Sequence, residues 1–300
     1  MCRPRPSSPN RFSNLRRIGA LCILAAIPSL ACGIANAHEA ESFAHWQVAL
    51  TLGYGDPSGY VQVRENQIEG TRLDFGSGLG VNHLSGEALQ IAYRIDPDQS
   101  VQMVLQNDTL SGSTVLPQDV YFNGATFAAG TRLRTVTHFP DFLRATVFYQ
   151  RTFSRFPNGG SLSGRAGFTF DGLTFKLDGT LTPDSIGHEM KEDFVTQELP
   201  VPMIGAQFDE PVNGRLAFVA SLDGAWLPRV NSLRTEGGEV TLAQTDMDAT
   251  LGLHYALTPR LGLTGDYRFG YFKQDERSHE DGNRILLKSH SIEFGLSYAF

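Results

Sequence analysis

The chain has few cysteines and no long apolar segment. Its three cysteines, Cys2, Cys22 and Cys32, all lie close to the amino terminus, so residues 38–300 can form neither a disulfide nor a thiolate metal site. The longest apolar run, residues 18–31, is too short to cross a bilayer as a helix. These absences argue against a disulfide framework, thiol catalysis and a helical membrane anchor.

The amino-terminal residues have the order of a secretory signal peptide. Five arginines precede the apolar run, and Ala35-Asn36-Ala37 follows it as a small-residue cleavage site. We expect cleavage after Ala37, which leaves residues 38–300 as the mature domain. Two alternatives are a twin-arginine signal at Arg16-Arg17 and a lipoprotein site at Cys32, but both lack the neighbouring residues that such signals usually have.

The mature chain is expected to be acidic. Residues 1–37 contain five of the 25 lysines and arginines and none of the 32 acidic residues, so their removal changes the formal net charge from −7 to −12. This balance argues against a nucleic-acid partner. It suits a cell surface on which divalent cations bridge neighbouring lipopolysaccharide molecules.

The last ten residues, Ser291 to Phe300, alternate strictly between apolar and polar or small side chains. The apolar set is Ile292, Phe294, Leu296, Tyr298 and Phe300. A tilted strand of about ten residues is long enough to cross a bilayer, and there its backbone is satisfied only within a closed barrel. The carboxyl terminus therefore predicts a membrane-spanning strand with one face to lipid and one to water.

Nine further segments show the same period of two residues. The ten predicted segments are 45–54, 87–94, 100–108, 141–151, 161–170, 201–209, 215–226, 246–257, 261–272 and 291–300. Short and long connections alternate between them, as they do between the periplasmic turns and extracellular loops of membrane barrels. We predict an all-β fold: a closed, antiparallel, up-and-down transmembrane β-barrel of about ten strands. A water-soluble barrel is the alternative, but it would turn its apolar face inward.

Two further turn signals leave eight to twelve strands open. Asp171-Gly172 and Asn123-Gly124 each lie between short alternating runs and could each close an extra hairpin. The runs after them are too short to cross the membrane again. We therefore expect both to belong to long strands that project beyond the bilayer.

Taken together, the signal peptide, the alternating segments, the asymmetric connections and the terminal Tyr298-Ala299-Phe300 resemble the small outer-membrane β-barrel proteins of Gram-negative bacteria. The resemblance covers residues 45–300 and implies a location in the outer membrane, in contact with its lipid and lipopolysaccharide. It also implies that Tyr298 and Phe300 act as an assembly signal for the barrel assembly machinery. Architecture of this kind does not specify function, and the sequence leaves the oligomeric state open.

Charged residues on the predicted inward faces are the first candidates for a functional site. They are Arg144, Arg165, Asp223, Asp248, Asp266, Arg268 and Glu293. Because unpaired charge in a narrow lumen is costly, we expect a paired network at similar depth. A three-residue turn at Thr258-Pro259-Arg260 is expected to place Asp248 beside Arg268, or one diagonal away if the register slips by one pair. The network would either plug the barrel or line a narrow passive channel.

Two spacings point to a competing enzymatic function. Asp246-Met247-Asp248 puts two carboxylates on one face, as in omptin proteases, but the chain has no Asp-x-His element to supply the base. His83-Leu84-Ser85 has the His-x-Ser spacing of outer-membrane lipid hydrolases, but it is expected to lie in a glycine-rich loop. We therefore predict a non-enzymatic barrel without cofactor or metal, with a hydrolase or a surface adhesin or receptor as alternatives.

Overall fold

The computed structural model describes residues 44–300 except for 123, 181–187, 197–198, 233–238 and 280. Within this range the side chains of residues 136–141 and 174–196 are also not described. The predicted signal peptide, residues 1–37, lies outside the described residues. All regular secondary structure in the described part is β-strand, as the alternation predicts.

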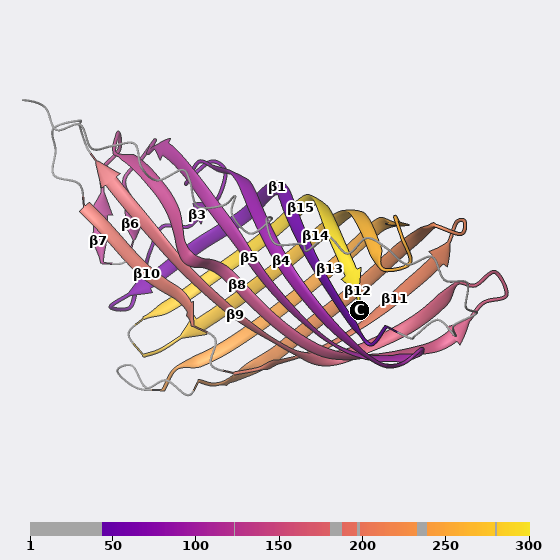
Figure 1. Cartoon of the computed structure of the whole chain (residues 1–300). Helices are drawn as coiled ribbons and strands as arrows, with labels where there is room; N and C mark the ends of the chain where they lie inside the picture. Colours follow the sequence, from indigo (N-terminus) through magenta and orange to yellow (C-terminus); the bar gives the residue numbers. More distant parts are fainter. Residues whose placement is uncertain (1–43, 123, 181–187, 197–198, 233–238, 280) are drawn as a thin grey trace, which may run out of the picture. The chain divides into compact units, whose positions relative to one another are not determined.

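Ten strands form a closed antiparallel barrel (Figure 1). They are β1 (Trp46–Glu65), β4 (Val81–Asp96), β5 (Gln99–Val115), β8 (Arg132–Arg155), β9 (Ser161–Thr180), β11 (Val201–Pro211), β12 (Leu216–Asn231), β13 (Thr241–Ala256), β14 (Leu261–Arg277) and β15 (Gly282–Ala299). Neighbours in the chain are neighbours in the barrel, β1 pairs with β15, and the shorter strand β10 (His188–Thr196) pairs with the outer part of β9. The predicted ten-strand, up-and-down topology is confirmed.

Four short turns lie at the same end of the barrel as the first and last strand residues. Their side chains stabilise them locally: Asn213 Oδ1 accepts hydrogen bonds from the backbone N–H groups of Arg215 and Leu216, each at 2.9 Å. In another turn, Asp96 Oδ1 accepts from the N–H of Asp98 at 2.8 Å. In outer-membrane barrels the end with the short turns is the periplasmic rim, and we use this term for it.

The outer wall near this rim is apolar. On β15, Ile292 and Phe294 are 58% and 68% exposed, and the apolar residues of β1 and β9 lie outward as their alternation predicts. Large apolar side chains exposed in this way would be unfavourable in water over so wide a surface. The apolar wall therefore requires a lipid environment.

Nine of the ten barrel strands hold 16 to 24 residues, whereas about ten suffice to cross a bilayer. The strands thus project beyond the membrane on the side opposite the rim. Strand β9 passes straight through Asp171-Gly172, as expected. The connection between the predicted segments 261–272 and 291–300 is shorter than their bounds imply, because β14 and β15 continue as a hairpin in which the Ser278 N–H donates to the carbonyl of Asp281.

The expectation that Asn123-Gly124 belongs to a long projecting strand is wrong. Strands β6 (Val120–Phe122) and β7 (Ala125–Phe127) form a separate two-stranded hairpin within the β5–β8 connection, and Asn123 itself lies outside the described residues. The β1–β4 connection carries two further short strands, β2 (Ile68–Glu69) and β3 (Leu73–Asp74).

Apolar side chains of both connections pack with inward residues of the projecting strands. This buried cluster, here called the apolar cap, comprises Val61, Val63, Leu73, Phe75, Leu79, Val81, Leu84, Leu110, Leu116, Val120, Phe122, Phe127, Leu133, Phe142, Leu173, Phe272, Ile285 and Leu287. The rings of Phe142 and Phe272 lie 4.9 Å apart. Their strands, β8 and β14, are five places apart in either direction around the ring, so this contact crosses the lumen.

Candidate functional site

Below the apolar cap, Arg144 joins acidic residues from two other strands. Its guanidinium donates to Asp171 at 2.8 Å and to Asp248 at 2.7 Å, and it lies 3.4 Å from Asp246. Asp171 is the direct cross-strand neighbour of Arg144 on β9, whereas Asp246 and Asp248 lie on β13, on another part of the wall. Gln244 donates to both Asp171 and Asp246, at 2.6 and 2.7 Å. These contacts form a polar layer directly below the cap.

Arg268 extends the same layer. It donates two hydrogen bonds to Asp248, at 2.6 and 3.0 Å, and lies 3.6 Å from Glu293. The turn between β13 and β14 holds the three expected residues, 258–260, because the Leu257 N–H donates to the carbonyl of Leu261 at 2.9 Å. In the resulting register, however, Asp248 lies opposite Gly270. The expectation that such a turn puts Asp248 directly beside Arg268 is wrong: the two are diagonal neighbours, and the long arginine side chain reaches across.

A second group of charges lies nearer the periplasmic rim. Arg165 donates to Asp223 at 2.9 Å and to Gln150 at 3.0 Å, and also to Gln207. His254 Nε2 lies 3.3 Å from Asp266. Six of the seven predicted lumen residues therefore make ion pairs with charges of opposite sign, and the seventh, Asp266, contacts His254. The two groups meet on the wall, where Asp223 lies opposite Asp248.

A glycine lies opposite most of the lumen acids in the strand ladder. The pairs are Asp108 with Gly86, Asp223 with Gly205, Asp248 with Gly270, Asp266 with Gly252, and Glu293 with Gly53. A Cβ atom at Gly86, Gly205 or Gly252 would collide with a carboxylate oxygen of the facing acid. At these three positions the missing side chain thus leaves the room that the facing carboxylate occupies.

Several members of the site are not evident from the sequence. There Asp171 belongs to a possible turn, and Asp108, Gln106 and Gln244 form no recognisable motif. Asp108 accepts a hydrogen bond from Gln106 at 2.6 Å. Gln106 and Asp108 are two residues apart on β5 and therefore face the lumen together. This spacing, with Gly86 opposite Asp108, is the sequence signal that identifies Asp108.

The lower lumen is an open cavity of about 910 Å³, lined by both polar and apolar side chains. Its ceiling is the layer of Arg144, Asp248 and Arg268, and residues of the short turns, such as Asp98 and Asn213, line its mouth. The cavity therefore opens at the periplasmic rim.

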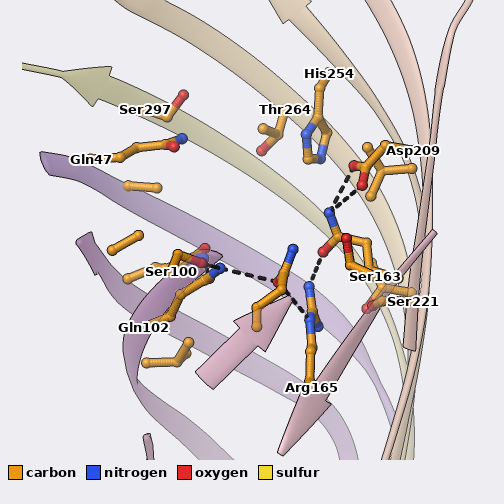
Figure 2. A pocket seen from close by; sticks show the side chains of 18 of the residues that line it. Gln47, Ser100, Gln102, Ser163, Arg165, Asp209, Ser221, His254, Thr264 and Ser297 are labelled. Carbon is orange, nitrogen blue, oxygen red and sulfur yellow. Dashed lines mark hydrogen bonds between the residues drawn. The ribbon is translucent and has the colours of Figure 1, made fainter. Parts of the chain in front are cut away.

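Amide side chains form a hydrogen-bonded row along one wall of this cavity (Figure 2). Gln90 donates to Gln102 at 2.6 Å, and Gln102 donates to Gln150 at 3.1 Å. Arg165 links Gln150 to Gln207, whose amide donates to Asp209 at 2.7 and 2.9 Å. The row thus runs over five successive strands, from β4 to β11.

The two enzymatic spacings fall in different surroundings. His83 and Ser85 lie in strand β4 rather than in a loop, on its outward face, and His83 Nδ1 is 2.7 Å from the hydroxyl of Tyr54. Asp246 and Asp248 do face the lumen together. Their partners are arginines and Gln244; the histidine on the same strand, His254, is six residues from Asp248 towards the rim and pairs with Asp266.

Beyond the membrane, charged residues appear on the outer wall. Asp275 lies 2.9 Å from Arg277, 3.1 Å from Arg229 and 3.6 Å from Arg284. Burial by itself would raise the pKa of Asp275, but hydrogen bonds from Arg277 and Arg229 outweigh it and lower the pKa below its ordinary value. The hydrogen bond to Asp275 in turn raises the pKa of Arg277.

Two features that could suggest other functions are absent from the described residues. No group of three or more histidines, cysteines and acids in that part of the chain is placed to hold a metal ion. The same residues contain no helix that is long and apolar enough to cross a membrane.

No known protein family matches the chain, and no curated protein is similar to it in sequence. Solved structures are similar to it in fold. The outer membrane protease OmpT from Escherichia coli matches with a TM-score of 0.48 and 12% identity, over 85% of this chain and 97% of that one. The translocator domain of the autotransporter NalP from Neisseria meningitidis gives 0.38 and 13%, over 87% and 90%. The Pseudomonas putida toluene transporter TodX gives 0.35 and 10%, over 85% and 90%.

At such identities the likeness concerns the fold alone, and these neighbours differ from one another in activity. The assignment of this chain depends on its own structure: ten strands close without an edge, and the outer wall beside the short turns is rich in large exposed apolar side chains. Backbone groups in lipid must be paired within the protein, and a closed barrel achieves this. The protein is an outer-membrane β-barrel of the Gram-negative type.

Proposed function

We propose that the protein is a closed outer-membrane barrel with a structural, non-catalytic role, which gives no continuous path for solutes across the membrane. The observation that supports this most directly is the contact between Phe142 and Phe272, which joins opposite walls of the barrel within the apolar cap. The layer around Arg144 lies directly beneath. A narrow diffusion channel is the alternative, and it would require both layers to move.

Conductance in planar lipid bilayers tests this proposal. The purified protein should insert without stepwise current, because an apolar lumen filled by packed side chains excludes water and ions. A variant that lacks the hairpin β6–β7, replaced by a Gly-Ser linker, removes part of the cap and serves as the comparison. Stepwise ion current through the unaltered protein would refute the closed barrel, whereas current through the variant alone would identify the cap as the seal.

The absence of catalysis is a second element of the proposal. Asp246 and Asp248 are engaged by Arg144, Gln244 and Arg268, which leaves neither carboxylate next to a histidine that could share in activating water. Purified protein should therefore hydrolyse neither peptide nor phospholipid ester substrates. Hydrolysis that disappears in Asp246→Asn, but persists in the outward control His290→Ala, would support the protease-like alternative instead.

We further propose that the carboxyl terminus is the signal for the barrel assembly machinery and that lipid and lipopolysaccharide contact the outer wall. The last residue closes the barrel: Phe300 and Trp46 exchange backbone hydrogen bonds at 2.9 and 3.1 Å. Phe300→Ala keeps these backbone bonds. It should lower the amount of folded protein in cells without changing its stability after refolding in vesicles; equal losses in both would contradict a signalling role.

A further inference from the structure

The cavity at the periplasmic rim has the size and accessibility of a ligand site. Its volume of about 910 Å³ lies within the range of roughly 300–1,000 Å³ that is usual for small-molecule pockets. It is closed above by the layer of Arg144 and Arg268 and lined at its mouth by turn residues. A ligand could therefore enter from the periplasm and could not pass through.

Several charged groups in this cavity are already paired with one another, whereas Asp209 accepts hydrogen bonds from the amide of Gln207. Arg165 holds Asp223, Arg268 holds Asp248, and Asp266 lies beside His254. A charged ligand would have to break such a pair, and leaving one buried charge without its partner is strongly unfavourable. A small ion is therefore disfavoured at these paired groups.

The amide and hydroxyl groups of the cavity can form hydrogen bonds with a ligand. Seven glutamines line the cavity, and four of them keep unused hydrogen-bonding atoms: within the described residues, Gln90 Oε1, Gln106 Oε1, Gln150 Nε2 and Gln47 Nε2 form no hydrogen bond. An amide can make up to four hydrogen bonds, so each of these side chains has capacity left. An apolar occupant would bury this capacity without satisfying it.

These groups face one another across the open space. Figure 2 shows Thr264 and Ser297 across the open space from Ser100 and Gln102, whereas Gln47 lies on β1, two strands from Gln102. A molecule between the two walls would meet donors and acceptors on both of its faces. Small residues, including Ala49 and Ala88, leave the room between them.

We propose that this cavity binds a short, uncharged saccharide from the periplasm. A saccharide presents hydroxyl groups, each of which donates and accepts, on both faces of its rings, and this pattern complements two walls of amides and hydroxyls. An N-acetylated sugar adds an amide that can pair with a glutamine side chain. The inference goes beyond the structural role proposed above, since a closed barrel can exist with or without a ligand.

Isothermal titration of the purified protein in lipid nanodiscs tests the proposal, because both barrel ends are then accessible. The probes are maltotriose, a plain glucan, and triacetylchitotriose, its N-acetylated counterpart. Saturable binding of one molecule per barrel by either probe is the expected result, and preference between them identifies the class of sugar. If neither probe binds at millimolar concentrations, the proposal is wrong.

Two variants locate the site. Gln90→Leu removes an amide that otherwise bonds only Gln102 and should weaken binding about five- to tenfold, the effect of one lost hydrogen bond. Ala88→Phe fills the cavity without removing a polar group and should abolish binding. Gln62→Leu, a glutamine of the projecting end that donates to Gly70, is the matched control and should bind normally. Binding that is unchanged in both Gln90→Leu and Ala88→Phe would overturn the assignment to this cavity.

Discussion

Phe142 and Phe272 bring their rings to 4.9 Å from each other, although their strands lie on opposite sides of the barrel. Both side chains are almost completely buried. Their contact makes the projecting end of the barrel a packed protein core rather than a water-filled mouth, and this has measurable consequences for stability.

Phe272→Ala should destabilise the barrel by about 3–5 kcal/mol, because it leaves a cavity in a dense apolar cluster. Urea unfolding in phospholipid vesicles, followed by the fluorescence of Trp46 and Trp226, measures the change. Phe272→Leu, which keeps most of the volume, is the control and should cost clearly less. Equal stability of Phe272→Ala and the unaltered protein would show that the cap is not packed as described.

Gly252→Ala should cost about 1–3 kcal/mol, because the added Cβ collides with the carboxylate of Asp266 on the facing strand. Gly265→Ala, on the next strand, is a matched control: its Cβ would meet only the Phe294 ring at 3.8 Å. The control should be neutral or slightly stabilising, since alanine restricts the unfolded chain. If the two variants unfold at the same urea concentration, the facing glycine is not required.

Arg144→Met should lower the free energy of unfolding by about 3–5 kcal/mol, because Asp171, Asp246 and Asp248 then lose their shared cation. Asp246→Asn should change it by less than about 1 kcal/mol, since Arg144 keeps two carboxylates and the amide can still bond Gln244. The same urea titration compares the two. A larger loss in Asp246→Asn than in Arg144→Met would contradict the central role of the arginine.

Leu251→Arg tests the lipid-facing wall, where Leu251 is 53% exposed. An arginine on the lipid face near the bilayer centre costs about 2–4 kcal/mol. Ala243→Arg provides the control: the residue lies on the same face of β13, at the projecting end and opposite Asp275, and should cost little. Folding yield in vesicles separates the two variants. If Leu251→Arg folds as well as Ala243→Arg, this part of the wall does not contact lipid.

Asp275 should make part of the stability depend on pH. Its folded pKa is lowered, so its contribution is fully present above the unfolded value of about 3.9 and is lost as the pH falls through the folded pKa. Asp275→Asn should therefore be less stable than the unaltered protein at pH 7, by less than about 1 kcal/mol for a partly exposed ion pair. The difference should vanish towards pH 2. A difference that is constant from pH 7 to pH 2 would exclude this ionisation as its cause.

The sequence by itself determined the architecture and the two faces of each strand. Alternation with a period of two is a local property, so Phe294 is predicted to face outward and Glu293 inward without knowledge of any neighbouring strand. The order of short and long connections then predicted about ten strands and a common side for the termini. These predictions hold because lipid imposes the same pattern on every strand that crosses it.

Only the tertiary structure decided which inward groups meet. Arg144 binds Asp171 through the register of β8 with β9, and binds Asp248 across the lumen because the closed ring brings β13 within reach. Neither contact can be predicted from the apolar and polar alternation of a single strand. The apolar cap depended on the same closure: inward leucines and phenylalanines beyond the membrane conflict with a water-filled lumen, and they are stable only because two connections fold against them and exclude water.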